Sequence, residues 1–90
     1  MTRARVLVVE DEFIVSKDIQ SSLTKLGYNV IGTAATGEKA IEIALDHQPD
    51  VILMDIMLKG DLSGIQAAER ILKERSIPII FLTAYADDST

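Results

Sequence analysis

Acidic side chains follow two short apolar runs, and carboxylates in this arrangement are suited to binding a divalent metal. Glu10 and Asp11 come directly after the run at residues 6–9, and Asp55 comes directly after the run at 51–54. Apolar, β-branched runs of this kind are typical of buried parallel strands, and open α/β sheets bind ligands at the carboxyl ends of such strands. Carboxylates held together repel one another unless a cation or a proton offsets the charge. The pattern therefore predicts a hard ion such as Mg²⁺ at this edge.

The length and composition indicate one small domain with a hydrophobic core. The chain has 90 residues, of which 48% are hydrophobic, and its formal net charge is −5. An acidic balance argues against a nucleic-acid-binding surface. The absence of cysteine excludes disulfides and thiolate metal sites. No apolar run is long enough for a signal peptide or a membrane span, so we expect a cytoplasmic domain that binds neither nucleic acid nor membrane.

Strand and helix patterns alternate along the whole chain. The predicted strands cover residues 5–10, 28–35, 51–55 and 78–82. The predicted helices cover residues 12–26, 37–47 and 64–75, with Thr36 as a helix N-cap and a Ser63–Gln66 capping box. Alternation with short connections predicts an α/β fold, in which a parallel sheet is covered by helices on both faces.

Two apolar patterns make specific predictions about the core. The helix at 12–26 presents Val15, Ile19, Leu23 and Leu26 at helical spacing, which predicts its buried face. The strand at 78–82 is apolar at four successive positions, so we expect an interior strand with Phe81 in the core. A fifth strand and at least one helix would then lie beside it, or a second chain would cover that edge by homodimerisation or segment exchange.

Thr83 and Ala84 mark a third strand end, because they follow the strand at 78–82. An acidic pair, an aspartate and a Thr-Ala pair at three successive strand ends resemble the receiver domain of two-component response regulators. The resemblance covers residues 1–90 as one receiver domain that is incomplete at its C-terminus. It implies a flavodoxin-like, doubly wound parallel sheet of strand order 2-1-3-4, with the fifth strand and the last helices missing from this chain.

The resemblance assigns the acidic residues to phosphoryl transfer. Asp55 would accept a phosphoryl group from a histidine kinase or a phosphotransfer domain, acting as a carboxylate nucleophile. Mg²⁺ would be held by Asp11, Asp55, the backbone carbonyl of Met57 and, more weakly, Glu10. Such a domain catalyses only its own phosphorylation and dephosphorylation, so we do not expect a conventional enzyme. Capping of the first helix is a competing role for Glu10 and Asp11.

The same resemblance implies a switch after the fourth strand. The hydroxyl of Thr83 would donate a hydrogen bond to a phosphoryl oxygen. This contact would shift the conformation of the surface after the fourth strand, so that a local change of charge alters a larger surface. Ala84 would leave room for the phosphate, and Tyr85 would modulate dephosphorylation and partner access. A strand-end hydroxyl bonded to backbone is the structural alternative for Thr83, and surface packing is the alternative for Tyr85.

Three departures from the receiver pattern are visible. Receivers often have proline four residues after the aspartate, where this chain has Lys59. Gly64 comes nine residues after Asp55 rather than eight, so the intervening loop is one residue longer. The lysine that receivers carry on the fifth strand falls beyond residue 90.

Two other functions are compatible with parts of the pattern. A pseudo-receiver would be an interaction module that is never phosphorylated, and the missing lysine is the feature that favours it. A Mg²⁺-dependent phosphatase with an aspartyl-phosphate intermediate would often need a second acid two residues after Asp55. Met57 occupies that position, which argues against the phosphatase.

Overall fold

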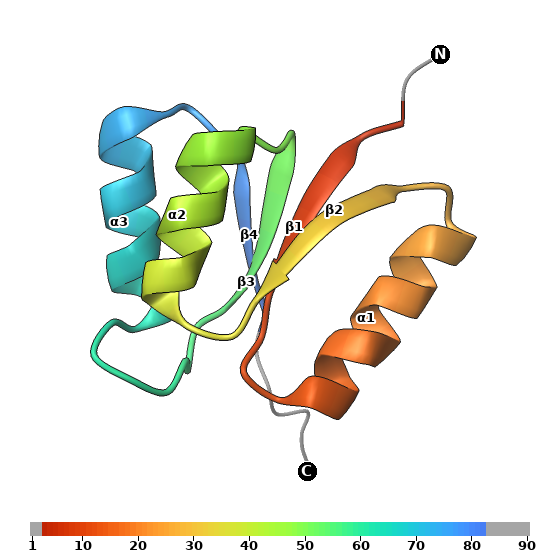
Figure 1. Ribbon diagram of the computed structural model, residues 1–90, viewed down its shortest axis with the longest axis horizontal. Coiled ribbons are helices and arrows are strands. Elements are labelled where there is room, and N and C mark those ends of the chain that lie inside the picture. The colour runs from red at the N-terminus through yellow and green to blue at the C-terminus, as the bar shows by residue number, and fades with distance from the viewer. Residues whose placement is uncertain (1–2, 83–90) are drawn as a thin grey trace, which may run out of the picture.

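Four parallel strands form the centre of the fold, a sheet whose order is β2-β1-β3-β4 (Figure 1). The computed structural model describes residues 3–82. The strands are β1 (Arg5–Val9), β2 (Asn29–Ala34), β3 (Val51–Asp55) and β4 (Ile79–Leu82). The strand order confirms the predicted α/β architecture. The bounds of β3 match the prediction, whereas β1, β2 and β4 are shorter than predicted by one residue at one or both ends.

Three helices connect these strands, and local signals in the sequence set their ends. The helices are α1 (Phe13–Lys25), α2 (Gly37–His47) and α3 (Gly64–Glu74). Thr36 Oγ1 accepts the N–H of Lys39 at 3.1 Å, and the capping box of Ser63 and Gln66 is complete. Both predicted caps of α2 and α3 are therefore confirmed. None of the helices in the described part of the chain is long and apolar enough to cross a membrane.

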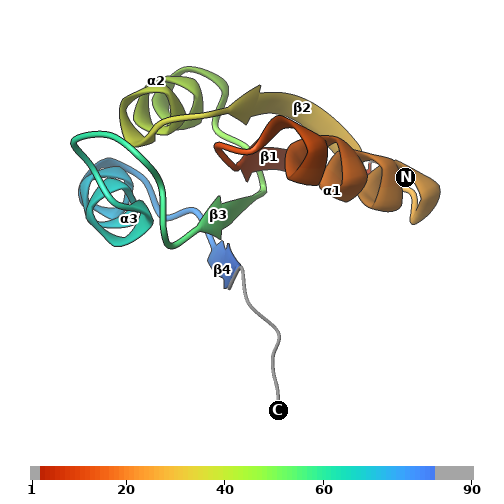
Figure 2. The same cartoon turned by 90° about the horizontal axis from the view of Figure 1, so that it is seen from below.

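The helices form two layers, with α1 on one face of the sheet and α2 and α3 on the other (Figure 2). The main core lies between the sheet and the α2–α3 layer. It is built from side chains that alternate along the strands, such as Leu7, Ile52 and Met54, and from Ala44 and Ile71 of the helices. Right-handed crossovers produce this division of the helices, as expected for parallel strands.

The α1 face is more open than the sequence pattern suggested. Val15 is 38% exposed and Leu26 is 74% exposed, so the buried face predicted for this helix is wrong at both positions. Phe81 is 40% exposed, and its predicted place in the core is also wrong. Within residues 3–82 the strand β4 is the last of the sheet, and nothing in this range covers its outer edge. The pairing of this edge with another strand or chain stays a prediction.

Arg5 ties the start of β1 to the end of α2. Its main-chain N–H donates to Asp50 Oδ2 at 2.7 Å, and its guanidinium donates to the carbonyl oxygens of Gln48 and His47 at 2.9 and 2.8 Å. Carbonyls at a helix C-terminus lack helical partners and carry partial negative charge, so a cation stabilises them. The contact fixes α2 against the edge of the sheet opposite to the acidic residues.

Replacing Arg5 with alanine is expected to lower the free energy of unfolding by about 1–2 kcal/mol, because two charge-assisted hydrogen bonds of this half-buried residue are lost. The main-chain bond to Asp50 remains in this variant. Urea denaturation measures the change. Arg5→Lys is the matched control, and it should recover only part of the loss, because an ammonium lacks the planar fork that reaches two carbonyls. An alanine variant as stable as wild type would show that the two guanidinium hydrogen bonds do not stabilise the fold.

Candidate functional site

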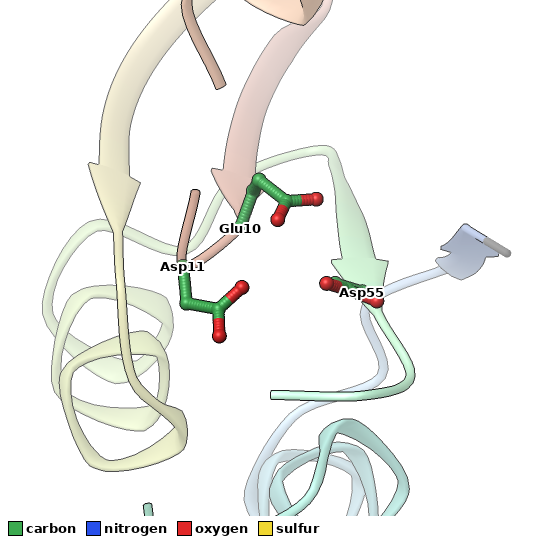
Figure 3. Close-up of side chains that lie close together, drawn as sticks. All are labelled: Glu10, Asp11 and Asp55. Atoms are coloured by element: carbon green, nitrogen blue, oxygen red, sulfur yellow. The ribbon is translucent and has the colours of Figure 1, made fainter. Parts of the chain in front are cut away.

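Glu10, Asp11 and Asp55 lie together at the carboxyl edge of the sheet (Figure 3). Strands β1 and β3 are neighbours, and Val9 is paired with Met54, so the residues that follow the two strands emerge side by side. Each acidic residue offers one carboxylate oxygen, and these oxygens all lie within 4.8 Å of one another. The structure thus brings together the three carboxylates that the sequence placed at these strand ends.

Each of the three carboxylates accepts one main-chain N–H. The pairs are Glu12 N to Glu10 Oε2 at 3.1 Å, Met57 N to Asp55 Oδ1 at 3.0 Å, and Lys59 N to Asp11 Oδ2 at 3.2 Å. Hydrogen bonds to ionised groups are stronger than neutral ones, and they fix the orientation of the acceptor. The backbone of the two loops therefore orients the carboxylates but does not neutralise them.

The charge of this cluster is not balanced by the described part of the protein. Glu10 is 8% exposed and Asp55 is 3% exposed, and between residues 3 and 82 no lysine or arginine forms an ion pair with either. Burial, opposed by the Glu12 N–H and reinforced by the negative charge of Asp55, raises the pKa of Glu10 to about 7. A proton on Glu10 thus partly relieves the repulsion near neutral pH. A divalent cation that displaced this proton would offset more of the negative charge than the proton does.

The donor set fits a hard divalent ion. Three carboxylate oxygens within reach of one another, two of them on buried residues, match the preference of Mg²⁺ for a few carboxylates together with water. An open hollow of about 440 Å³ lies over the carboxylates and gives room for water and a small anion. Its other lining residues are Glu12, Val15, Ile19, Met57, Lys59 and Leu82.

The remaining site residues of the sequence analysis have different outcomes. Met57 lies at the rim of the hollow, with its side chain 75% exposed, and the role of its carbonyl stays a prediction. Thr83, Ala84 and Tyr85 lie outside the described residues. The strand that precedes them pairs Leu82 with Asp55. This pairing brings the end of β4 to the acidic edge.

Gly64, which the sequence places nine residues after Asp55, supports the site by packing against its backbone, a role that the sequence did not show. Its N–H donates to the carbonyl of Ile56 at 3.0 Å, and a Cβ added at this position would overlap the carbonyl of Asp55. The first residue of α3 is thus packed directly against the backbone that carries Asp55. A glycine immediately after the Ser63 cap was the available signal, but only the tertiary structure shows what lies opposite it.

Comparisons with known proteins agree with this geometry. The response regulator receiver domain family matches residues 6–90. The transcriptional regulatory protein PdtaR of Mycobacterium tuberculosis is 39% identical over 82 residues, which cover 91% of this chain and 40% of that protein. The phyllosphere-induced regulator PhyR of Methylorubrum extorquens is 40% identical over 83 residues, which cover 91% of this chain and 31% of that protein. The chain thus spans less than half the length of either relative.

Solved structures show the same fold. The signal receiver domain of a modulated diguanylate cyclase from Desulfovibrio desulfuricans superposes with a TM-score of 0.87 at 40% identity, covering 93% of this chain and 67% of that one. The receiver domain of PhyR from Erythrobacter litoralis gives a TM-score of 0.85 at 40% identity, covering 94% and 66%. With the sheet order, the acidic edge and these matches in agreement, the chain belongs to the response regulator receiver domain family.

Proposed function

We propose that this receiver domain accepts a phosphoryl group on Asp55 in a Mg²⁺-dependent reaction. The observation that supports the proposal is the place of Asp55, a 3% exposed carboxylate at the end of β3 with two further carboxylates beside it. Burying an ionised carboxylate beside two others costs free energy, through desolvation and repulsion. Such a cost is typical of a functional site. Phosphoryl transfer fits this site, because the reaction needs positioning and charge neutralisation more than covalent help.

The reaction forms one bond and breaks one. A carboxylate oxygen of Asp55 attacks the phosphorus of the donor, an acyl phosphate forms, and the bond from phosphorus to the donor's histidine nitrogen breaks. Met57 N–H, which donates to Asp55 Oδ1, holds the carboxylate in one orientation. Asp11, Asp55, the Met57 carbonyl and Glu10 would hold Mg²⁺, which supplies charge neutralisation when it is bound.

A histidine kinase or a phosphotransfer domain is the proposed donor. Met57, which lines the hollow, is 75% exposed, and Phe13 and Ile14, which follow the lining residue Glu12 in the chain, are 74% and 76% exposed. Exposed apolar side chains on the segments that carry a reactive site favour a protein-docking surface there. Thr83 would then report the phosphate, and Ala84 and Tyr85 would tune its lifetime and the access of partners.

The test is phosphate incorporation from a small donor such as acetyl phosphate with Mg²⁺, followed by intact-mass measurement. Wild type should gain one phosphate-sized increment, and Asp55→Asn should gain none. Asp61→Asn is the matched control, because Asp61 is an exposed aspartate in the same loop and should leave incorporation unchanged. An increment that persists in Asp55→Asn would place the chemistry elsewhere. No increment on wild type would favour a receiver that acts by interaction alone.

A further inference from the structure

One hydrogen bond at the acidic site joins two loops that are far apart in the sequence. The main-chain N–H of Lys59 donates to Asp11 Oδ2 at 3.2 Å, across 48 positions of the chain. Glu10 and Asp55, in contrast, each accept a hydrogen bond from the main-chain N–H two residues later in the chain. The orientation of Asp11 therefore depends on the loop that follows β3, whereas the other two carboxylates are oriented by their own loops.

Asp11 is also the carboxylate with the greatest freedom to leave the cluster. It is half-buried, whereas Glu10 and Asp55 are buried. Repulsion from two neighbouring carboxylates favours a side chain that turns outward to water. The amide of Lys59 opposes this movement with a charge-assisted hydrogen bond. Figure 3 shows the Asp11 carboxylate facing the space that it shares with Glu10 and Asp55.

We propose that the main-chain amide of Lys59 is a positioning group for the divalent cation, because it holds Asp11 beside Asp55 before the ion binds. The proposal rests on the function proposed above, since it takes Asp11 as a ligand. Hydrogen bonds that fix the orientation of a metal ligand typically change affinity by about 10–100-fold. The ammonium group is not part of the proposal: among residues 3–82, Lys59 Nζ pairs with no carboxylate.

Two substitutions at one position separate the amide from the ammonium. Lys59→Pro removes both the N–H and the charge, whereas Lys59→Ala removes only the charge. Calorimetric titration should show that the proline variant binds Mg²⁺ about tenfold more weakly than wild type. The alanine variant should stay within about threefold, the effect of one exposed charge. Equal affinities for the two variants, or tighter binding by the proline variant, would overturn the proposal.

A second measurement does not depend on how the proline variant folds. In wild type without Mg²⁺, the Lys59 amide should be protected from hydrogen exchange and its proton resonance shifted downfield. Asp11→Ala removes the acceptor, so both signatures should be lost at Lys59 but kept at Met57, whose acceptor is Asp55. A Lys59 amide that is unaffected by Asp11→Ala would refute the proposed contact.

Phosphate incorporation distinguishes this inference from the function on which it rests. With saturating Mg²⁺, Lys59→Pro should regain the incorporation rate of Lys59→Ala, because only affinity has been lost. If wild type is phosphorylated on Asp55 while the two variants bind Mg²⁺ equally, the positioning role is wrong and the function stands. If wild type binds no Mg²⁺ at all, the proposed function and the positioning role are both wrong.

Discussion

Gly64→Ala is expected to lower the free energy of unfolding by about 3 kcal/mol, the upper part of the range for overpacking. A methyl group at this position would overlap the carbonyl of Asp55 and would lie 3.0 Å from Ile56 Cα. Both obstacles are backbone atoms, so no side-chain rotation can relieve them. Either α3 moves away from β3 or the end of β3 shifts, and a shift of β3 would displace Asp55 from Glu10 and Asp11.

Urea denaturation and Mg²⁺ titration together test this expectation. Gly32→Ala is the matched control, because a Cβ there would meet Ile43 Cγ2 at 3.6 Å, an ordinary contact distance. It should cost far less than the change at Gly64 and should leave Mg²⁺ affinity unaltered. A Gly64→Ala protein with wild-type stability and wild-type affinity would mean that α3 is not packed tightly against the backbone of Asp55.

Glu10→Gln is expected to stabilise the metal-free protein at pH 8 by about 3 kcal/mol, because a pKa raised by about 2.5 corresponds to 1.36 kcal/mol for each pH unit. Burial raises the pKa of Glu10 from 4.5 to about 7. The folded state therefore binds more protons than the unfolded state between these values, and wild-type stability falls as pH rises through this window. Glutamine carries no charge to desolvate, so the variant escapes this loss.

The difference in stability between Glu10→Gln and wild type is the quantity to measure, from pH 4 to pH 8 without Mg²⁺. It should be small near pH 4, grow between about pH 4.5 and pH 7, and level off above that, following the raised pKa of Glu10. Glu69→Gln is the control, because Glu69 is an exposed carboxylate on α3 and its removal should produce no comparable gain. A difference that is constant with pH would show that ionisation of Glu10 does not lower the free energy of unfolding.

Added Mg²⁺ provides an independent check on the role of Glu10. A ligand that binds only the folded state stabilises it in proportion to the logarithm of its concentration. At pH 8 wild type should therefore gain more stability from Mg²⁺ than Glu10→Gln does. If Mg²⁺ stabilised both proteins equally, Glu10 would not be a metal ligand, although burial would still disfavour its ionised form.

The predictable part of the fold came from local signals in the sequence. The caps at Thr36 and Ser63 fix the starts of α2 and α3, because a side-chain oxygen satisfies an amide that the helix leaves unpaired. The apolar runs before Glu10 and Asp55 mark strands, because continuous β-branched runs of this length are typical of strands in a parallel sheet. The strand order came from the resemblance to receiver domains, and right-handed crossovers between parallel strands then assign the helices to the two faces of the sheet.

Prediction failed where burial depends on what lies opposite a side chain. Val15, Leu26 and Phe81 have the spacing and residue types of core positions, yet they are exposed on the open face of α1 and on β4. Periodicity shows which face of an element is apolar, but it does not show whether another element covers that face. Within residues 3–82, these three residues are only partly covered.

The sequence by itself determined that carboxylates stand at two strand ends of a parallel sheet, and hence that they meet at one edge. Only the tertiary structure decided how they meet: burial that raises the pKa of Glu10, an amide of Lys59 that reaches Asp11, and a glycine at position 64 pressed against the backbone of Asp55. The physical reason is that strand ends are set by local pattern, whereas desolvation and close approach depend on groups distant in the chain.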